Sequence, residues 1–210
     1  MNLSVDVISD VICPWCYIGK RRLEKAIASH DGPVKVRWLP FQLNPMMPNE
    51  GISRREYRTK KFGSWERSLE LDAQVAAAGA AEGIQFAFDR IERTPNTVDG
   101  HRLIWLAEQQ SIQDAVVEAL FLAYFTQGRD ISNRQTLIDV VAEAGLDRNR
   151  AEAVLNSNDG REAIRKTEEL SRRHRVDGVP FFIINGTITL GGAQPSDVFL
   201  AAFDQAVGSK

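Results

Sequence analysis

The chain has 210 residues, of which 43% are hydrophobic and 26% charged, enough for a substantial buried core. Its 26 Lys and Arg residues against 28 Asp and Glu residues give a formal net charge of -2, which argues against general affinity for nucleic acid or anionic membranes. No apolar run approaches the ~18 residues that a transmembrane helix needs, and the first residues do not resemble an export signal. We therefore expect a cytoplasmic globular protein.

The N-terminal part of the chain predicts a strand, a helix and a second strand. Apolar and polar residues alternate over 3–8, as in a half-buried strand. Cys13 follows directly, and Pro14 suits the first turn of a helix, so Cys13 is expected at or beside the N-cap. This helix is expected to end near Gly32, and the alternation over 34–41 predicts the second strand.

From about residue 46 to about residue 157 the pattern is almost wholly helical. Apolar residues at helical spacing predict helices over 64–83 and 113–128. Ser132 and Gln135 match a capping box, which predicts the start of another helix. We interpret the apolar stripes of these helices as core-forming faces and not as a cofactor groove.

The C-terminal part returns to a mixed pattern. A charged helix is expected over about 159–174, and an apolar run follows at 181–184. Asn185 and Gly186 are typical of a two-residue type I′ turn. Residues 187–190 are therefore expected to return as the second strand of a hairpin.

A last helix is expected from Pro195 onward. The order of elements predicts an α/β fold in which residues 1–45 and 158–210 form one discontinuous domain. Residues 46–157 form a helical insertion domain in this interpretation.

Only two cysteines occur in the chain, and they are separated by two residues. A thiolate is the species that attacks a disulfide, and the positive end of a helix dipole favours a thiolate at Cys13. Cys16 lies one helical turn later, close enough to displace a substrate from Cys13. The spacing predicts a redox pair with Cys13 as nucleophile and Cys16 as resolving thiol, while Pro14 and Trp15 shape the surface around them.

Asp10 precedes Cys13 by three residues and has two interpretations. As an acid at a strand end, it could pass protons to Cys16 during resolution. It could equally cap the following helix with its carboxylate. The sequence leaves both interpretations open.

A zinc site would need two ligands besides the cysteines, and the chain offers only His30, His101 and His174, which are scattered. We therefore predict no metal site, and we interpret His101 as a packed residue of the insertion. Three tryptophans could line a cleft above the cysteines, although core packing explains them as well: Trp38, Trp65 and Trp105.

Two motifs resemble the thioredoxin superfamily. They are Cys-Pro-Trp-Cys at 13–16, after a strand, and Gly-Val-Pro-Phe-Phe at 178–182. The resemblance implies a thioredoxin-like fold with a large all-helical insertion. It also implies that Pro180 is preceded by a cis peptide bond and lies against the cysteines, where the backbone of Val179 helps to hold a substrate.

The chain resembles the DsbA-like family more specifically, and within it the FrnE-type members. The segments that carry this resemblance are the helical insertion, residues 39–45, Asn96 and Thr97 before His101, and residues 191–194. The resemblance implies dithiol–disulfide exchange or isomerisation on a thiol- or disulfide-containing protein or small molecule. It implies no tightly bound cofactor and is compatible with a homodimer.

The related 2-hydroxychromene-2-carboxylate isomerases and kappa-class glutathione transferases share this architecture but carry serine at the position of Cys13. They leave a glutathione-dependent isomerase or transferase acting on a small aromatic metabolite as one alternative. Glutathione would then bind at Asn96, Thr97, Val179 and Pro180. A polypeptide-binding, chaperone-like module is a second alternative. The direction of electron flow stays open, although a reducing cytosol favours reduction or isomerisation.

Overall fold

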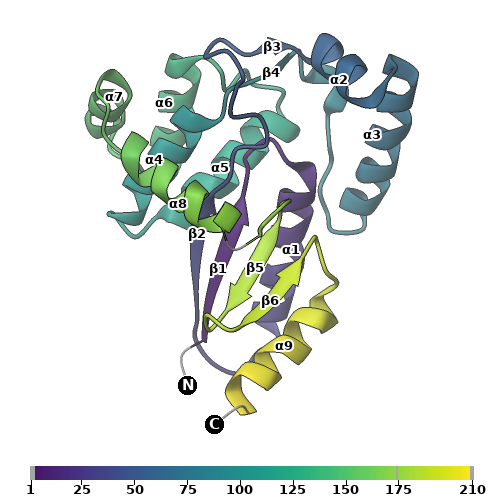
Figure 1. Ribbon diagram of the computed structural model, residues 1–210, viewed down its shortest axis with the longest axis vertical. Coiled ribbons are helices and arrows are strands. Elements are labelled where there is room, and N and C mark those ends of the chain that lie inside the picture. Colours follow the sequence, from purple (N-terminus) through teal and green to yellow (C-terminus); the bar gives the residue numbers. More distant parts are fainter. Residues whose placement is uncertain (1–2, 174, 209–210) are drawn as a thin grey trace.

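The fold is built around a four-stranded sheet (Figure 1). The computed structural model describes residues 3–173 and 175–208. β1 (Leu3–Ser9) and β2 (Val34–Pro40) run parallel, and α1 (Pro14–Ala28) connects them. A parallel pair needs such a crossover, because a short turn cannot return the chain to the same end of the sheet. The predicted strand, helix and strand are confirmed.

A hairpin completes the sheet on the other side of β1. β5 (Phe181–Ile184) pairs antiparallel with β1, and β6 (Ile188–Gly191) pairs antiparallel with β5. Asn185 and Gly186 both have positive φ, 48° and 72°, as a type I′ turn requires. The Oδ1 of Asn185 also accepts a hydrogen bond from the backbone of Ser4 at 3.0 Å. The predicted hairpin is confirmed.

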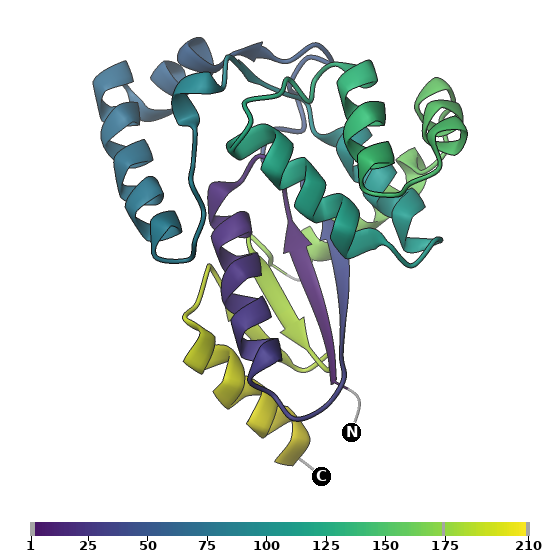
Figure 2. The ribbon, with the colours of Figure 1, turned by 180° about the vertical axis from the view of Figure 1, so that it is seen from behind.

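The last helix, α9 (Ser196–Gly208), packs beside α1 (Figure 2). Val7 of β1 and Phe182 of β5 are paired in register and fully buried. The ring of Phe182 meets Phe199 of α9 edge-on at 4.7 Å between centroids. Burial of these aliphatic and aromatic side chains is the main stabilisation of this layer.

Six helices between β2 and α8 gather at one end of the sheet (Figures 1 and 2). They are α2 (Arg54–Phe62), α3 (Trp65–Ala80), α4 (Val98–Glu108), α5 (Gln113–Phe125), α6 (Arg134–Glu143) and α7 (Arg148–Asn156). A short 3-10 helix, η1 (Phe88–Arg90), lies between α3 and α4. The expected α/β fold with a large helical insertion is confirmed, whereas the domain boundaries at 45 and 158 stay a prediction.

The expectation of an almost wholly helical insertion needs one correction. β3 (Ile52–Ser53) pairs antiparallel with β4 (Arg93–Thr94) to form a second sheet of two short strands. Two-residue strands are too short to produce a detectable alternation in the sequence. Gly51 precedes β3 with φ +67°, and a Cβ there would lie 2.5 Å from the carbonyl oxygen of Thr94. Glycine therefore allows the close approach of these two segments.

The start of α6 also differs from the prediction. Asn133, and not Ser132, is the N-cap, and its side chain accepts a hydrogen bond from the amide of Thr136 at 3.1 Å. The hydroxyl of Ser132 instead donates to Asp130. The capping-box interpretation was wrong because two neighbouring residues could both cap, and the local backbone selects Asn133. By contrast, the helix predicted over 64–83 begins where expected, with Ser64 as the N-cap of α3, and ends three residues earlier, at Ala80.

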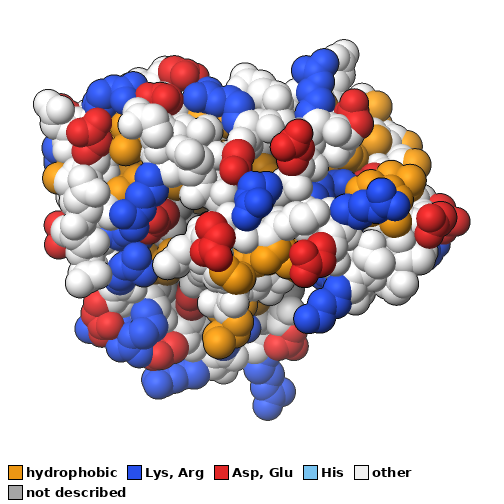
Figure 3. Space-filling view, turned by 90° about the horizontal axis from the view of Figure 1, so that it is seen from above, with side chains coloured by type: hydrophobic (Ala, Val, Ile, Leu, Met, Phe, Trp, Pro, Cys, Tyr) orange, Lys and Arg blue, Asp and Glu red, His pale blue; other side chains and the backbone are white. Residues whose placement is uncertain are grey.

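α8 (Arg161–Arg173) returns the chain from the insertion to the sheet and contacts both α4 and β2. The predicted end of this helix at His174 lies outside the described residues. None of the helices within 3–173 and 175–208 is long and apolar enough to span a membrane. The end of the molecule that carries the insertion displays Lys and Arg interspersed with Asp and Glu (Figure 3).

One continuous apolar core joins the sheet layer to the insertion. Tyr17 of α1 stacks on Phe121 of α5, with ring centroids 5.0 Å apart. Its hydroxyl donates a hydrogen bond to Glu118 at 3.0 Å, so the buried phenol is satisfied. The start of α1, which carries the cysteines, therefore packs against α5 of the insertion as well as against the sheet layer.

Candidate active site

The turn between β1 and α1 positions the two cysteines. The amide of Cys13 donates to the carbonyl of Asp10 at 3.0 Å, and Cys13 has the extended backbone of an N-cap (φ -93°, ψ 110°). Pro14 then opens the helix, and the amide of Cys16 donates to the Cys13 carbonyl at 3.0 Å. The predicted N-cap position of Cys13 is confirmed. A thiolate there faces the positive end of the α1 dipole.

The segment before β5 lies against Cys13, although 166 residues separate them in the sequence. The Sγ of Cys13 donates to the carbonyl of Val179 at 3.5 Å, and the Val179–Pro180 peptide bond is cis. The carbonyl of Pro180 accepts a hydrogen bond from the amide of Gly192 at 2.8 Å, which ties this segment to the end of β6. The expected cis bond and its position beside the cysteines are confirmed.

The two thiols differ in their surroundings. Both are free and buried, but Cys16 is fully enclosed, whereas Cys13 is 6% exposed and lines a cavity together with its neighbour Trp15. Burial raises the pKa of the Cys16 thiol well above its ordinary value, and the adjacent Cys13 raises it further. Hydrogen bonds from the Ser9 side chain and the Asp10 backbone oppose this rise without cancelling it. Cys16 is therefore a neutral thiol at neutral pH.

This difference predicts selective alkylation of the reduced protein. At neutral pH, iodoacetamide should modify Cys13 more than about tenfold faster than Cys16, because alkylation requires an accessible thiolate. Peptide mass spectrometry over a time course measures both rates. Urea-unfolded protein is the control, and its two cysteines should react at similar rates. Equal rates in the folded protein would contradict the assignment of the buried, neutral thiol to Cys16.

A cavity of about 320 Å³ lies beside Cys13, between the start of α1 and the α2–α3 pair. Trp15 forms part of its wall and is 41% exposed, the largest exposed fraction of the tryptophan side chains. Phe62 of α2, Val75 of α3 and Phe88 of η1 supply further apolar surface. The cavity therefore offers a small molecule a binding space next to Cys13.

Asp10 lies behind the cysteines and is fully buried. Its Oδ2 accepts a hydrogen bond from the amide of Leu43 at 2.8 Å, and its Oδ1 lies 3.4 Å from the Nε2 of His101 in α4. Among the described residues, neither this Oδ1 nor this Nε2 has a hydrogen-bond partner. The interpretation of Asp10 as a helix cap is wrong, because its side chain turns inward to Leu43. His101 is packed in the insertion, as expected.

The model of the DSBA-like thioredoxin domain matches residues 4–204 of this chain, which is almost the whole of the described structure. The chain belongs to the DsbA-like thioredoxin-domain family. The predicted thioredoxin-like fold with a helical insertion is thereby confirmed.

Sequence and structural similarity to known proteins is consistent with this family assignment. A probable DsbA oxidoreductase from Streptomyces coelicolor is 32% identical and has a TM-score of 0.91, with 99% of this chain and 91% of that chain covered. The uncharacterized protein YwbO from Bacillus subtilis is 26% identical over 95% of this chain and 94% of its own length. The cytosolic disulfide reductase DsbM from Pseudomonas aeruginosa is 20% identical, with a TM-score of 0.71 and coverage of 99% and 100%, and shares the fold.

In this DsbA-like protein, Asn96 and Thr97 are part of the connection between β4 and α4. The Nδ2 of Asn96 donates to the carbonyl of Met47 at 2.6 Å, and its Oδ1 accepts from the amide of Val98 at 3.0 Å. Thr97 is buried and serves as the N-cap of α4. Neither residue lines the cavity beside Cys13. Their proposed role in binding glutathione stays a prediction.

The interpretation of Trp38, Trp65 and Trp105 as walls of a cleft above the cysteines is wrong. Trp38 packs in the core against Phe121, and its indole nitrogen donates to Asp114 at 3.0 Å. Trp65 borders a separate hollow, and Trp105 contacts the backbone near Gly160. Within the described parts of the chain, no group of three or more His, Cys, Asp or Glu residues could hold a metal ion.

The residues of α2 at the cavity were missed by the sequence analysis. Arg54, Tyr57, Arg58 and Lys61 all line it. Their spacing of three and four residues places them on one face of a helix, which is the signal that could have identified them.

Proposed function

We propose that this DsbA-like protein is a thiol–disulfide oxidoreductase or isomerase in which Cys13 is the nucleophile and Cys16 the resolving thiol. The observation that carries the proposal is the position of the Cys13 sulfur. It lies at the N-terminus of α1, beside the cavity and 3.5 Å from the Val179 carbonyl. Cys16 lies one turn further along the helix, where solvent and substrate do not reach it.

The exchange begins when the Cys13 thiolate attacks one sulfur of a substrate disulfide. A bond forms between Cys13 and that sulfur, the substrate S–S bond breaks, and the other half leaves as a thiolate. Pro14 and Trp15 border the attacking sulfur, and the backbone of Val179 and Pro180 provides an edge along which an extended substrate chain can lie. These four residues are the proposed substrate-binding surface.

Resolution requires Cys16 to lose its proton. The resulting thiolate attacks Cys13, the Cys13–Cys16 disulfide forms, and the second half of the substrate leaves as a thiol. Because the pKa of Cys16 is raised by burial, a nearby proton acceptor would speed this step. We assign this relay to Asp10, whose amide contacts Cys16 and whose Oδ1 has no hydrogen-bond partner in the described structure.

The oxidised pair must be reduced again to turn over. We propose that glutathione serves as a redox partner without being tightly bound, and that the protein works in the cytoplasm. The cytosolic disulfide reductase DsbM, which has the same fold, has also been solved with GSH, and this supports the choice. A reducing cytosol favours reduction or isomerisation of substrates over net oxidation.

The proposal is tested by equilibrating the protein in buffers of reduced and oxidised glutathione and trapping the free thiols with acid and maleimide. We expect a reversible transition between the dithiol and a Cys13–Cys16 disulfide, detected by mass spectrometry. The midpoint should lie between about -270 mV and about -120 mV, the range of known exchange proteins. A pair that stays reduced in every buffer would contradict the proposed function.

A further inference from the structure

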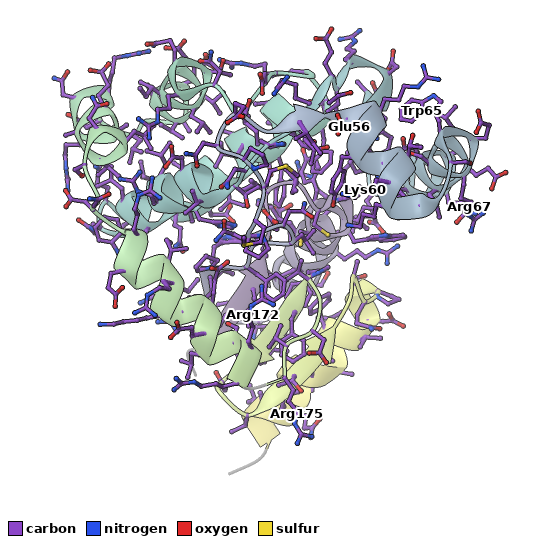
Figure 4. All side chains as sticks on the ribbon, turned by 45° about the horizontal axis from the view of Figure 1, so that its top comes forward. Glu56, Lys60, Trp65, Arg67, Arg172 and Arg175 are labelled. Carbon is purple, nitrogen blue, oxygen red and sulfur yellow. The ribbon has the colours of Figure 1, made fainter. Side chains whose placement is uncertain are left out.

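One wall of the cavity beside Cys13 is basic. Arg54, Arg58 and Lys61 occupy equivalent positions on successive turns of α2, and all three line the cavity. α2 lies in the upper part of the molecule, where Glu56 and Lys60 mark the same helix (Figure 4). The basic wall therefore comes from the insertion, and the attacking sulfur comes from the sheet layer.

The positive charges of this wall are only partly balanced. Asp72 of α3 pairs with Arg54 at 2.7 Å and with Arg58 at 2.6 Å. Lys61 donates to the hydroxyl of Tyr57 at 2.8 Å, and no carboxylate of the described residues forms an ion pair with it. Three cations thus face one carboxylate. Such an excess of positive charge in a half-enclosed site attracts an anion.

The surroundings of Arg58 agree with this charge excess. Its side chain is only 15% exposed, and burial lowers the pKa of its guanidinium, as does the nearby Arg54. Asp72 counteracts this effect and does not abolish it. A bound anion would relieve the repulsion between the two guanidinium groups.

Most of the remaining lining of the cavity is apolar, although Gln74 and Thr94 also belong to it. Ile12, Trp15, Phe62, Val75 and Phe88 contribute to it. The volume of about 320 Å³ falls at the small end of the ~300–1,000 Å³ typical of sites for small molecules. The cavity thus combines a reactive sulfur, a cationic side and an apolar side within the dimensions of a small organic compound.

We propose that this cavity binds a small organic disulfide with a carboxylate on an apolar body, the carboxylate contacting Arg58 and Lys61. The inference rests on the proposed redox role of Cys13 and names the substrate class for that site. Cys13 attacks the nearer ligand sulfur, and one half of the ligand leaves as a thiolate. Cys16 then displaces the other half. The ligand gains two electrons and becomes two thiols, the protein acquires the Cys13–Cys16 disulfide, and a low-molecular-mass thiol reduces it again.

Single-turnover kinetics of the reduced protein test this substrate class. Dithiobis(nitrobenzoate) is the anionic aromatic probe, bis(nitrophenyl) disulfide the uncharged one, and oxidised glutathione the anion without an apolar body. Each rate is divided by the rate at which the same probe reacts with a small free thiol in solution. This normalisation corrects for differences in intrinsic reactivity between the probes. We expect the highest normalised rate for dithiobis(nitrobenzoate), falling as salt is added. An equal or higher rate for either other probe would overturn the inference.

The variants Arg58→Gln and Lys61→Gln test whether the ligand carboxylate binds at these two side chains. Each should lower the ratio of the anionic to the uncharged rate about tenfold, the effect of one charge-assisted hydrogen bond. Lys60→Gln is the matched control, because Lys60 is on the same helix, is exposed and does not line the cavity. Its ratio should equal that of the unchanged protein. A tenfold fall in Lys60→Gln as well, or none in the other two, would overturn the inference.

Competition by benzoate in the unchanged protein avoids any dependence on variant folding. This sulfur-free carboxylate should slow the anionic probe and protect Cys13, and an absence of inhibition would overturn the proposed binding mode. A protein in which no probe produces either a mixed disulfide at Cys13 or the Cys13–Cys16 disulfide fails the proposed function itself. Normal reaction with every probe and no preference for the anionic one fails only the substrate class. Preference for a cystine-containing peptide over all three probes would indicate a polypeptide substrate and also overturn the inference.

Discussion

Serine in place of Cys13 will remove catalysed disulfide exchange, whereas serine in place of Cys16 will stop the reaction at a mixed disulfide. The Cys13→Ser variant has no thiolate at the end of α1 beside the cavity, so its rate should fall at least about a thousandfold, to that of the uncatalysed reaction. Cys16→Ser retains that thiolate and can still make the first attack. It lacks the thiol that releases the substrate.

The measurement is reduction of a small disulfide, followed by the appearance of free thiol, with mass spectrometry of the protein at each time point. Cys16→Ser should accumulate protein carrying one substrate half on Cys13. The pair of variants forms its own matched control, because each removes one sulfur atom from the same turn of α1. Full activity in Cys13→Ser, or a stable adduct on Cys16, would contradict the assignment of roles.

Local sequence patterns were sufficient to predict the elements that hold the cysteines. The alternation before Cys13 and the helix-opening Pro14 are determined by residues only a few positions apart, and both elements were found. The hairpin was equally predictable, because Asn185 and Gly186 readily adopt the positive φ that its turn requires. Signals of this kind depend on backbone sterics and do not need knowledge of the rest of the fold.

Contacts between distant segments could not be predicted in this way. The approach of His101 to Asp10 depends on how α4 packs over the end of β1, and no local pattern contains that information. The basic face of α2 is visible as a helical spacing, but only the folded insertion brings it to the cavity beside Cys13. The cysteine pair was therefore predictable from local patterns and the approach of Val179 and Pro180 only through a family resemblance, whereas the basic wall of the cavity was not predicted.

Arg102 is a second residue whose contacts could not be predicted from the local sequence. No local pattern singles it out in the sequence, where it stands in a helix whose other residues are mostly apolar. In the structure it is fully buried and joins α4 to the end of α7. Its Nε donates to the carbonyl of Asp159 at 2.8 Å, and its Nη2 donates to the carbonyls of Ser157, at 2.8 Å, and Val154. Its Nη1 donates to Asp99 at 2.7 Å.

Methionine in place of Arg102 should therefore lower the free energy of unfolding by about 3 kcal/mol. The substitution preserves much of the apolar stem but removes the hydrogen bonds that the guanidinium donates to the carbonyls of Val154, Ser157 and Asp159. Asp99 is less affected, because Arg134 also contacts it at 3.1 Å. Urea unfolding followed by circular dichroism measures the change as a shift of the midpoint with an unaltered slope.

Arg67→Met is the matched control, because it makes the same chemical change on the outer side of α3 (Figure 4). Arg67 is 54% exposed and pairs with Glu70, which is 61% exposed, so its loss should change stability by less than about 0.5 kcal/mol. Arg102→Lys should fall between the two, since one ammonium group cannot reach all the acceptors of a guanidinium. This variant also provides a measurement if Arg102→Met does not fold. Equal unfolding midpoints for Arg102→Lys, Arg67→Met and the unchanged protein would mean that these buried hydrogen bonds do not hold α7 in place.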